Sequence, residues 1–148
     1  MGIMIEGVIV SPLKVVDVLG GNVLHAMKAS DEEYKGFGEA YFSMIEKGII
    51  KGWKRHKEMT LNLIVPIGAI RFVLFDSRDN SVTTGKYFEV DLSLEHYNRL
   101  TIPPMVWMGF QGLEEGFSLL LNIANIPHSQ SEVEQKELDE IYFDWRSN

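Results

Sequence analysis

The sequence predicts an all-β protein, a sandwich or a barrel formed by one domain. Short apolar runs rich in β-branched and aromatic residues recur about every 8 to 12 residues, with turn-forming residues between them. Almost none of the chain shows the 3.6-residue periodicity of a long amphipathic helix. With 148 residues, of which 45% are hydrophobic and 11% aromatic, the chain can bury one substantial core.

The first half of the chain contains five expected strands. They cover residues 8–16, 23–27, 39–45, 48–55 and 61–65. Pro12 interrupts the first run, which is typical of an edge strand or a bulge. Gly20, Gly21 and Asn22 form a turn before the second, and residues 30–38 read as a polar connection with at most one helical turn, capped by Ser30.

The second half contains four further expected strands and a polar end. The strands cover residues 69–75, 87–92, 99–102 and 117–123. A tight turn at 66–68 precedes the first of them, residues 76–85 read as a hairpin loop, and Pro103 and Pro104 break the pattern after residue 102. We therefore expect a single domain over 1–148, with an acidic, solvated loop or short helix forming a polar tail from about residue 129.

Composition excludes several classes of protein. A formal net charge of −7 argues against nucleic-acid binding, which normally requires a basic surface. The chain has no cysteine, so disulfides and thiolate metal ligands are excluded and a cytoplasmic location is expected. No apolar run approaches the roughly 20 residues that span a bilayer, and the N-terminus lacks the basic region of a signal peptide.

The basic stretch 51–57 is the strongest local indication of a functional site. Lys54 and His56 stand two residues apart, so in an extended strand both side chains point to the same face. Lysine and histidine can hold an anionic ligand, and histidine can also transfer protons near neutral pH. The stretch therefore indicates a pocket that serves either binding or catalysis, although a polar strand end would have the same pattern.

Several ordered motifs resemble the dTDP-4-dehydrorhamnose 3,5-epimerase family. In chain order they are Ile5-Glu6-Gly7-Val8 with Lys14, the segment 48–56, Gly68-Ala69-Ile70-Arg71 with Asp76-Ser77-Arg78, Leu92-Ser93, and the segment 102–110. The resemblance covers nearly the whole chain. It implies a double-stranded β-helix jelly roll of the cupin type and a role in cell-surface polysaccharide biosynthesis.

The resemblance also implies departures from the family's chemistry. Lys54 stands where the family has its catalytic histidine, approximately Leu121 stands where it has its acidic tyrosine, and Gly20 replaces a nucleotide-binding arginine. The aspartate that pairs with the base comes from an extension beyond Asn148. In the related sugar-nucleotide 3,4-ketoisomerases, which carry His-x-His, the second histidine matches His56. The resemblance therefore implies an epimerase-like or isomerase-like protein without the standard base and acid.

The candidate catalytic residues are His56, Lys54 and Tyr41, with Tyr41 as a substitute proton donor on the preceding strand. Candidate substrate-binding residues lie on other strands and segments: His25, Asn62, Arg71 and Trp107. Trp107 could stack on a sugar or a base, and Asn62 and Arg71 could add polar contacts inside the barrel. Ordinary packing is an alternative explanation for each.

Two classes of function remain open. One is an enzyme that epimerises or isomerises a nucleotide-linked 4-keto sugar, and the other is a non-catalytic module that binds a sugar or nucleotide for a partner enzyme. Either takes a nucleotide-diphosphate sugar as its ligand. We expect no metal or other cofactor, since His56 with Glu58 is a poor ligand set. The resemblance implies a homodimer that exchanges N-terminal strands, for which residues 3–16 are sufficiently apolar.

Overall fold

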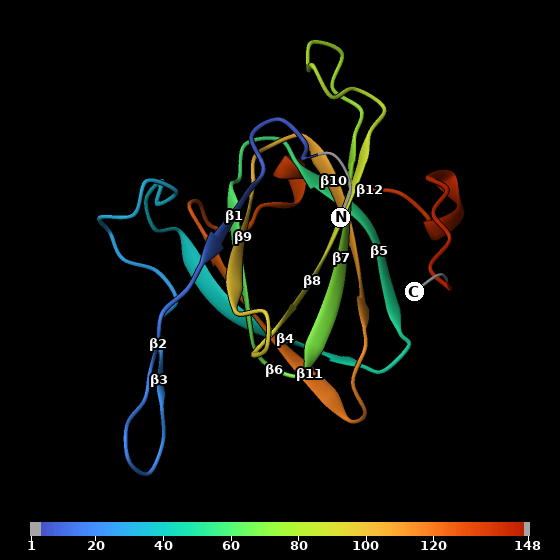
Figure 1. Ribbon diagram of the computed structural model, residues 1–148. Coiled ribbons are helices and arrows are strands. Elements are labelled where there is room, and N and C mark those ends of the chain that lie inside the picture. The colour runs from blue at the N-terminus through green and yellow to red at the C-terminus, as the bar shows by residue number, and fades with distance from the viewer. Residues whose placement is uncertain (1–3, 147–148) are drawn as a thin grey trace.

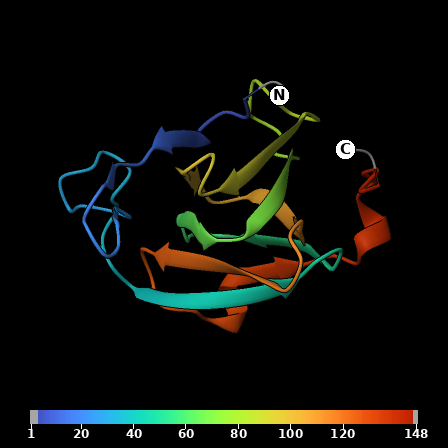
Figure 2. The same cartoon turned by 60° about the horizontal axis from the view of Figure 1, so that its bottom comes forward.

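Two antiparallel five-stranded sheets face each other in the computed structural model, which describes residues 4–146. In spatial order the first sheet contains β1 (Ile9–Pro12), β9 (Asn98–Ile102), β6 (Leu61–Ile67), β11 (Phe117–Ala124) and β4 (Glu39–Glu46). The second contains β12 (Val133–Gln135), β5 (Ile50–His56), β10 (Val106–Gly112), β7 (Ala69–Asp76) and β8 (Tyr87–Ser93). Figures 1 and 2 show these two layers. The prediction of an all-β jelly roll is confirmed, because strands dominate and residues 4–146 contain no α-helix.

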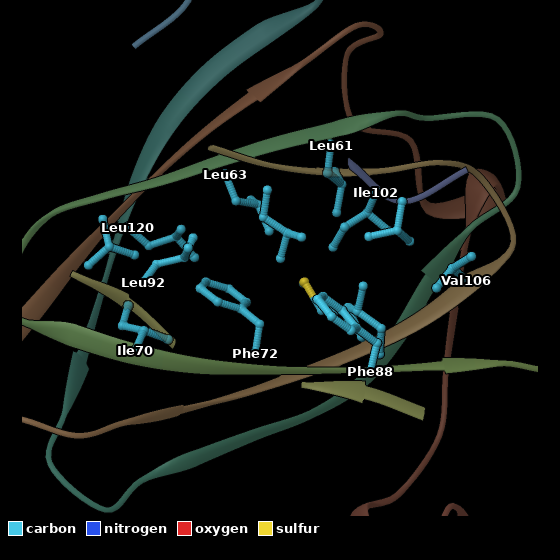
Figure 3. Close-up of a cluster of buried hydrophobic side chains, with 14 of the residues drawn as sticks. Leu61, Leu63, Ile70, Phe72, Phe88, Leu92, Ile102, Val106 and Leu120 are labelled. Carbon is cyan, nitrogen blue, oxygen red and sulfur yellow. The ribbon is translucent and has the colours of Figure 1, made fainter. Parts of the chain in front are cut away.

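The main core lies between the two sheets because inward residues alternate with outward ones along each strand. In β7, for example, Ile70, Phe72 and Leu74 are fully buried. Figure 3 shows Phe72 and Leu63 pointing toward each other from opposite sheets. This alternation also determines which polar side chains point into the interior.

A second apolar cluster covers the outer face of the second sheet. Trp53, Val73 and Trp107 pack there against Ile141 and Trp145 from the C-terminal segment. The indole Nε1 of Trp53 donates to two backbone carbonyl oxygens of that segment, both at 3.2 Å. The C-terminal segment is therefore bound to the sheet by packing and by hydrogen bonds.

Most of the segment 129–140 is exposed, as expected for a polar tail, but part of it is built into the second sheet. It contains the 3₁₀ turns η1 (Gln130–Glu132) and η2 (Leu138–Glu140), with β12 between them. Glu132 is only 6% exposed, and β12 pairs with β5 from Val133 opposite His56 to Gln135 opposite Lys54. The polar tail therefore contributes one buried carboxylate and one short strand that pairs with the basic end of β5.

Strand β10 was not predicted from the sequence, because Pro103 and Pro104 interrupt the apolar pattern just before it. Its residues pair with β7 along their whole length, from Val106 opposite Asp76 to Gly112 opposite Ile70. The turn expected at 66–68 is shorter in the structure: β6 continues through Ile67, and only Gly68 separates it from β7. Gly68 there has φ +83°, and a Cβ atom would collide with Ser118, so only glycine fits.

A small hairpin projects from the first sheet. Its strands are β2 (Val15–Val16) and β3 (Val23–Leu24), and Figure 1 shows it extending away from both sheets. Leu19 at its tip is fully exposed. No helix in the described part of the chain could cross a membrane.

Candidate functional site

A cavity of about 210 Å³ opens between the two sheets beside the main core. Apolar side chains from β6, β10 and β11 form its inner part. The polar side chains that line it come mainly from β4, β5, β11 and the C-terminal segment: Tyr41, Ser43, Lys51, Lys54, His56, Asn122, His128 and Gln135. All three predicted catalytic residues therefore lie in one cavity.

The alternation of β5 brings two of these residues to the cavity. Lys54 and His56 line the cavity, whereas Trp53 packs in the outer cluster and Arg55 pairs with Glu134. The sequence-based prediction that Lys54 and His56 share one face is confirmed. Tyr41 enters the cavity from β4, which belongs to the opposite sheet.

His56 is held by a buried carboxylate. Its Nδ1 lies 2.8 Å from Oε1 of Glu132, and the two side chains are 12% and 6% exposed. An ionised carboxylate only accepts hydrogen bonds, so Nδ1 carries the proton and donates it. In neutral His56 this leaves Nε2 as the basic nitrogen.

Glu132 is itself fixed by the backbone. Its Oε2 accepts hydrogen bonds from the N–H groups of Glu58 at 3.0 Å and Met59 at 2.8 Å. Burial alone would raise the pKa of Glu132, but the hydrogen bonds from His56 and from these two N–H groups outweigh it. The pKa of Glu132 therefore lies below its usual value, and the group is ionised at neutral pH.

Tyr41 is positioned by a residue of β11. The side-chain Nδ2 of Asn122 donates to the Tyr41 hydroxyl oxygen at 3.0 Å. Because this bond uses the hydroxyl as an acceptor, the phenol proton stays free to be donated elsewhere. Tyr41 and His56 thus provide a proton donor and a basic nitrogen from opposite sheets of one cavity.

Two lysines add positive charge to the cavity. Lys51 donates from Nζ to the backbone oxygen of Met44 at 3.1 Å. Lys54 forms no side-chain hydrogen bond or ion pair with any residue in 4–146. An anionic group that enters the cavity can therefore pair with Lys54 without displacing a protein partner.

The four predicted substrate-binding residues lie elsewhere. His25 lines a separate hollow with Lys14 and Arg99, and Asn62 accepts from Thr101 at 2.6 Å and donates to Glu33. Arg71 pairs with Asp91 through Nε at 3.0 Å. Trp107 packs in the outer cluster, because it alternates with Met108, which lines the cavity. The structure does not bring these four residues to the cavity, so their binding roles stay predictions.

Sequence reasoning missed Glu132 and Asn122. Asn122 had a detectable signal, since it is an amide on the inward face of an apolar strand, between Leu120 and Ala124. Glu132 had none, because its position depends on how the C-terminal segment returns to β5. Within the described chain, no three His, Asp or Glu side chains are placed to bind a metal ion together.

Comparisons with known proteins agree with this architecture. A family model described as dTDP-4-dehydrorhamnose 3,5-epimerase matches residues 5–148. The crystal structure of a dTDP sugar isomerase from Desulfovibrio desulfuricans superposes with a TM-score of 0.93 at 38% identity, covering 99% of this chain and 96% of that one.

Two curated relatives connect the family to glycan assembly. The probable low-salt glycan biosynthesis epimerase Agl13 of Haloferax volcanii is 28% identical over 104 residues, which are 69% of this chain and 67% of the relative. The spore coat polysaccharide biosynthesis protein SpsL of Bacillus subtilis is 24% identical over 148 residues, covering 97% of this chain and 98% of the relative.

Several solved structures with the same fold contain a ligand. One of them is ChmJ, a 3′-monoepimerase from Streptomyces bikiniensis in complex with dTDP-quinovose, with a TM-score of 0.80 and 14% identity. The superposition covers 90% of this chain and 71% of that one. At this identity the likeness concerns the fold.

Proposed function

Because the chain belongs to the dTDP-4-dehydrorhamnose 3,5-epimerase family, we propose that it is an enzyme that epimerises a nucleotide-linked 4-keto sugar for cell-surface polysaccharide biosynthesis. The observation that carries this proposal is the pairing of His56 with Glu132 in the cavity that also contains Tyr41. The relatives connected with glycan and spore-coat polysaccharides support the biological role.

The reaction begins at a carbon next to the ketone of the sugar. Nε2 of His56 removes a proton from that carbon, and Glu132 stabilises the imidazolium that forms. The electrons move into the carbonyl, giving an enolate whose negative oxygen is stabilised by the ammonium group of Lys54. Tyr41 then returns a proton to the carbon, and the ketone is restored.

The position of the acid favours epimerisation over isomerisation. Tyr41 and His56 lie on strands of opposite sheets, β4 and β5. A proton taken from one face of the ring and returned to the other inverts the carbon. Moving a hydrogen between neighbouring carbons, as an isomerase does, instead suits groups on one face.

In this proposal neighbouring residues replace the family's base and acid. The family's base position holds Lys54 and its acid position approximately Leu121. His56 stands two residues after the base position. Tyr41 lies opposite Asn122 in the pairing of β4 with β11, next to the acid position. The carboxylate that supports the base comes from residue 132 within the chain.

A deuterium-exchange experiment tests this function. The protein is incubated in D₂O with dTDP-4-keto-6-deoxyglucose and the sugar is followed by NMR. Epimerisation predicts deuterium at C3 or C5 together with inversion at the labelled carbon. Label at another carbon would indicate isomerisation and overturn the proposed reaction.

The labelling result, together with a melting-temperature measurement, distinguishes the enzyme from the alternative, a non-catalytic binding module. The lysine at the family's base position favours that alternative. A binding module would raise its melting temperature with dTDP-sugars but would leave the sugar unlabelled. If no nucleotide sugar raised the melting temperature or became labelled, both functions would be excluded.

We also propose that the protein is a homodimer that exchanges N-terminal strands. An isolated two-stranded hairpin is marginally stable in water, and the β2–β3 hairpin exposes Val18, Leu19 and Val23. A second copy would cover these side chains and pair the free hairpin edge. A cytoplasmic site of action fits the absence of cysteine from the chain.

A further inference from the structure

Asn122 is a buried residue that lines the cavity and has one hydrogen-bonding atom without a partner in residues 4–146. Asn122 is 3% exposed. It stands between Leu120 and Ala124 on the inward face of β11 and lines the cavity. Nδ2 donates to the hydroxyl oxygen of Tyr41 at 3.0 Å. Oδ1 is buried and has no hydrogen-bond partner among the described residues.

A buried carbonyl oxygen without a partner is unusual, because native proteins pair nearly all such groups. Among residues 4–146 only two other buried side-chain atoms share this state, in Arg99 and Trp145, and neither residue lines this cavity. The unused acceptor therefore coincides with the residues that we assign to proton transfer. Such a coincidence is expected where the missing partner is a ligand.

The chemistry of the acceptor limits what the partner can be. Oδ1 needs a donor, which a ketone oxygen and a fully ionised diphosphate lack and a sugar hydroxyl supplies. The cavity volume of about 210 Å³ is also below the roughly 300–1,000 Å³ of sites that enclose whole drug-sized ligands. A sugar ring fits this space better than a complete nucleotide does.

We propose that Asn122 determines substrate specificity: Oδ1 accepts a hydrogen bond from a ring hydroxyl of the sugar, while Nδ2 holds Tyr41 with its phenol proton directed to the same ring. This inference rests on the proposed function, since it places a sugar in the cavity. One amide group then recognises the substrate and positions the acid. A sugar that lacks the recognised hydroxyl leaves Oδ1 unpaired and is bound less well.

Calorimetric titration with dTDP and with dTDP-quinovose separates the sugar contact from the nucleotide contacts. The wild-type protein is expected to bind dTDP-quinovose more tightly than dTDP. Asn122→Leu, which has a similar volume and no polar atom, should bind dTDP-quinovose about tenfold less tightly and dTDP with unchanged affinity. Asn125→Leu is the matched control: Asn125 accepts from the backbone of Thr60 outside the cavity, so its loss should leave the preference for the sugar intact.

Analogues of dTDP-quinovose that each lack one ring hydroxyl identify the group that is recognised. One of them should bind the wild-type protein about tenfold less tightly than the parent, and Asn122→Leu should not distinguish that analogue from the parent. If Asn122→Leu folds poorly, Asn122→Asp provides the second measurement. It keeps an acceptor for the sugar but replaces the donor to Tyr41, so KM should change little while kcat falls.

The outcomes are distinct. Equal weakening of dTDP and dTDP-quinovose in Asn122→Leu, or no weakening of either, would overturn the role of Asn122 while leaving the proposed function in place. An unchanged kcat in Asn122→Asp would overturn the positioning of Tyr41. A wild-type protein that binds neither compound would exclude the proposed function, and this inference with it.

Discussion

The carboxylate of Glu132 lies 2.8 Å from Nδ1 of His56, although 76 positions separate the two residues in the chain. The contact forms because the C-terminal segment returns as β12 and pairs with the end of β5. The backbone N–H groups of Glu58 and Met59 hold the other carboxylate oxygen, so the anion is fixed before any ligand enters. The segment that provides the partner of His56 is thus also part of the second sheet.

Replacing Glu132 should destabilise the protein. In Glu132→Ala two backbone N–H groups and His56 lose their acceptor, which should lower the free energy of unfolding by about 2–3 kcal/mol. Urea denaturation measures this change. Glu134→Ala, two residues further along in β12, is the control: its partly exposed pair with Arg55 should contribute much less. Equal effects of the two substitutions would contradict the structural role of Glu132.

Stability should fall in acid because buried carboxylates must take up protons. Burial would raise the pKa of Asp76, but hydrogen bonds from Arg78, Ser81 and Thr83 outweigh this effect, so the pKa lies far below its usual value. The pKa of Glu132 is also lowered, but less strongly. A carboxyl whose pKa is lowered by folding contributes stability above its unfolded pKa of about 4, and this contribution is lost as the pH falls toward the folded pKa.

Measurement of the free energy of unfolding between pH 7 and pH 3 checks this expectation. The wild-type protein should lose stability over that range, most steeply below about pH 4. Asp76→Asn removes the carboxylate whose pKa is lowered most and should make the loss smaller, and Glu132→Gln, which removes the second such carboxylate, should also make it smaller. Identical pH dependence in all three proteins would show that these groups do not carry the effect.

Substitution of the proposed base and acid should reduce turnover without unfolding the protein. We expect His56→Gln and Tyr41→Phe each to lower kcat on a nucleotide-linked 4-keto sugar by about 10²- to 10⁴-fold. His96→Gln changes a histidine outside the cavity and should retain activity. The rate of deuterium incorporation at the inverted carbon is the measurement, and wild-type rates in Tyr41→Phe would exclude Tyr41 as the proton donor.

Lys54 should contribute mainly through its charge. Lys54→Met keeps the length and the apolar stem but removes the ammonium group, so the affinity for dTDP-sugars should fall by about tenfold at low salt and by less at high salt. Lys54→Arg keeps the charge and should retain part of the affinity. Calorimetry at two ionic strengths tests this, and an affinity of Lys54→Met that equals the wild-type value would remove Lys54 from the binding site.

The hairpin should control assembly. Leu19 is fully exposed at its tip, so Leu19→Asp would place a charge where a second copy is proposed to cover it. Light scattering after gel filtration should show a dimer for the wild-type protein and a shift toward monomer for the variant. Asp17→Ser, a polar substitution in the same hairpin, should leave the dimer intact. A monomeric wild-type protein would exclude strand exchange.

Much of the fold could be predicted from local pattern. The alternation of apolar residues identified β4, β5, β7, β8 and β11, and it placed Lys54 and His56 on one face. These predictions succeed because side-chain direction in a strand depends only on neighbouring residues. The strand β10 escaped detection because the two prolines before it looked like the end of the apolar pattern.

The sequence by itself determined the β architecture, the family and the segment that carries the proposed base. Only the tertiary structure decided that Glu132 meets His56, that Asn122 holds Tyr41, and that Trp107 and Asn62 lie away from the cavity. Such pairs depend on which strands become neighbours and in which register. That choice is made by the packing of the whole chain, so residues far apart in sequence carry no local sign of their contact.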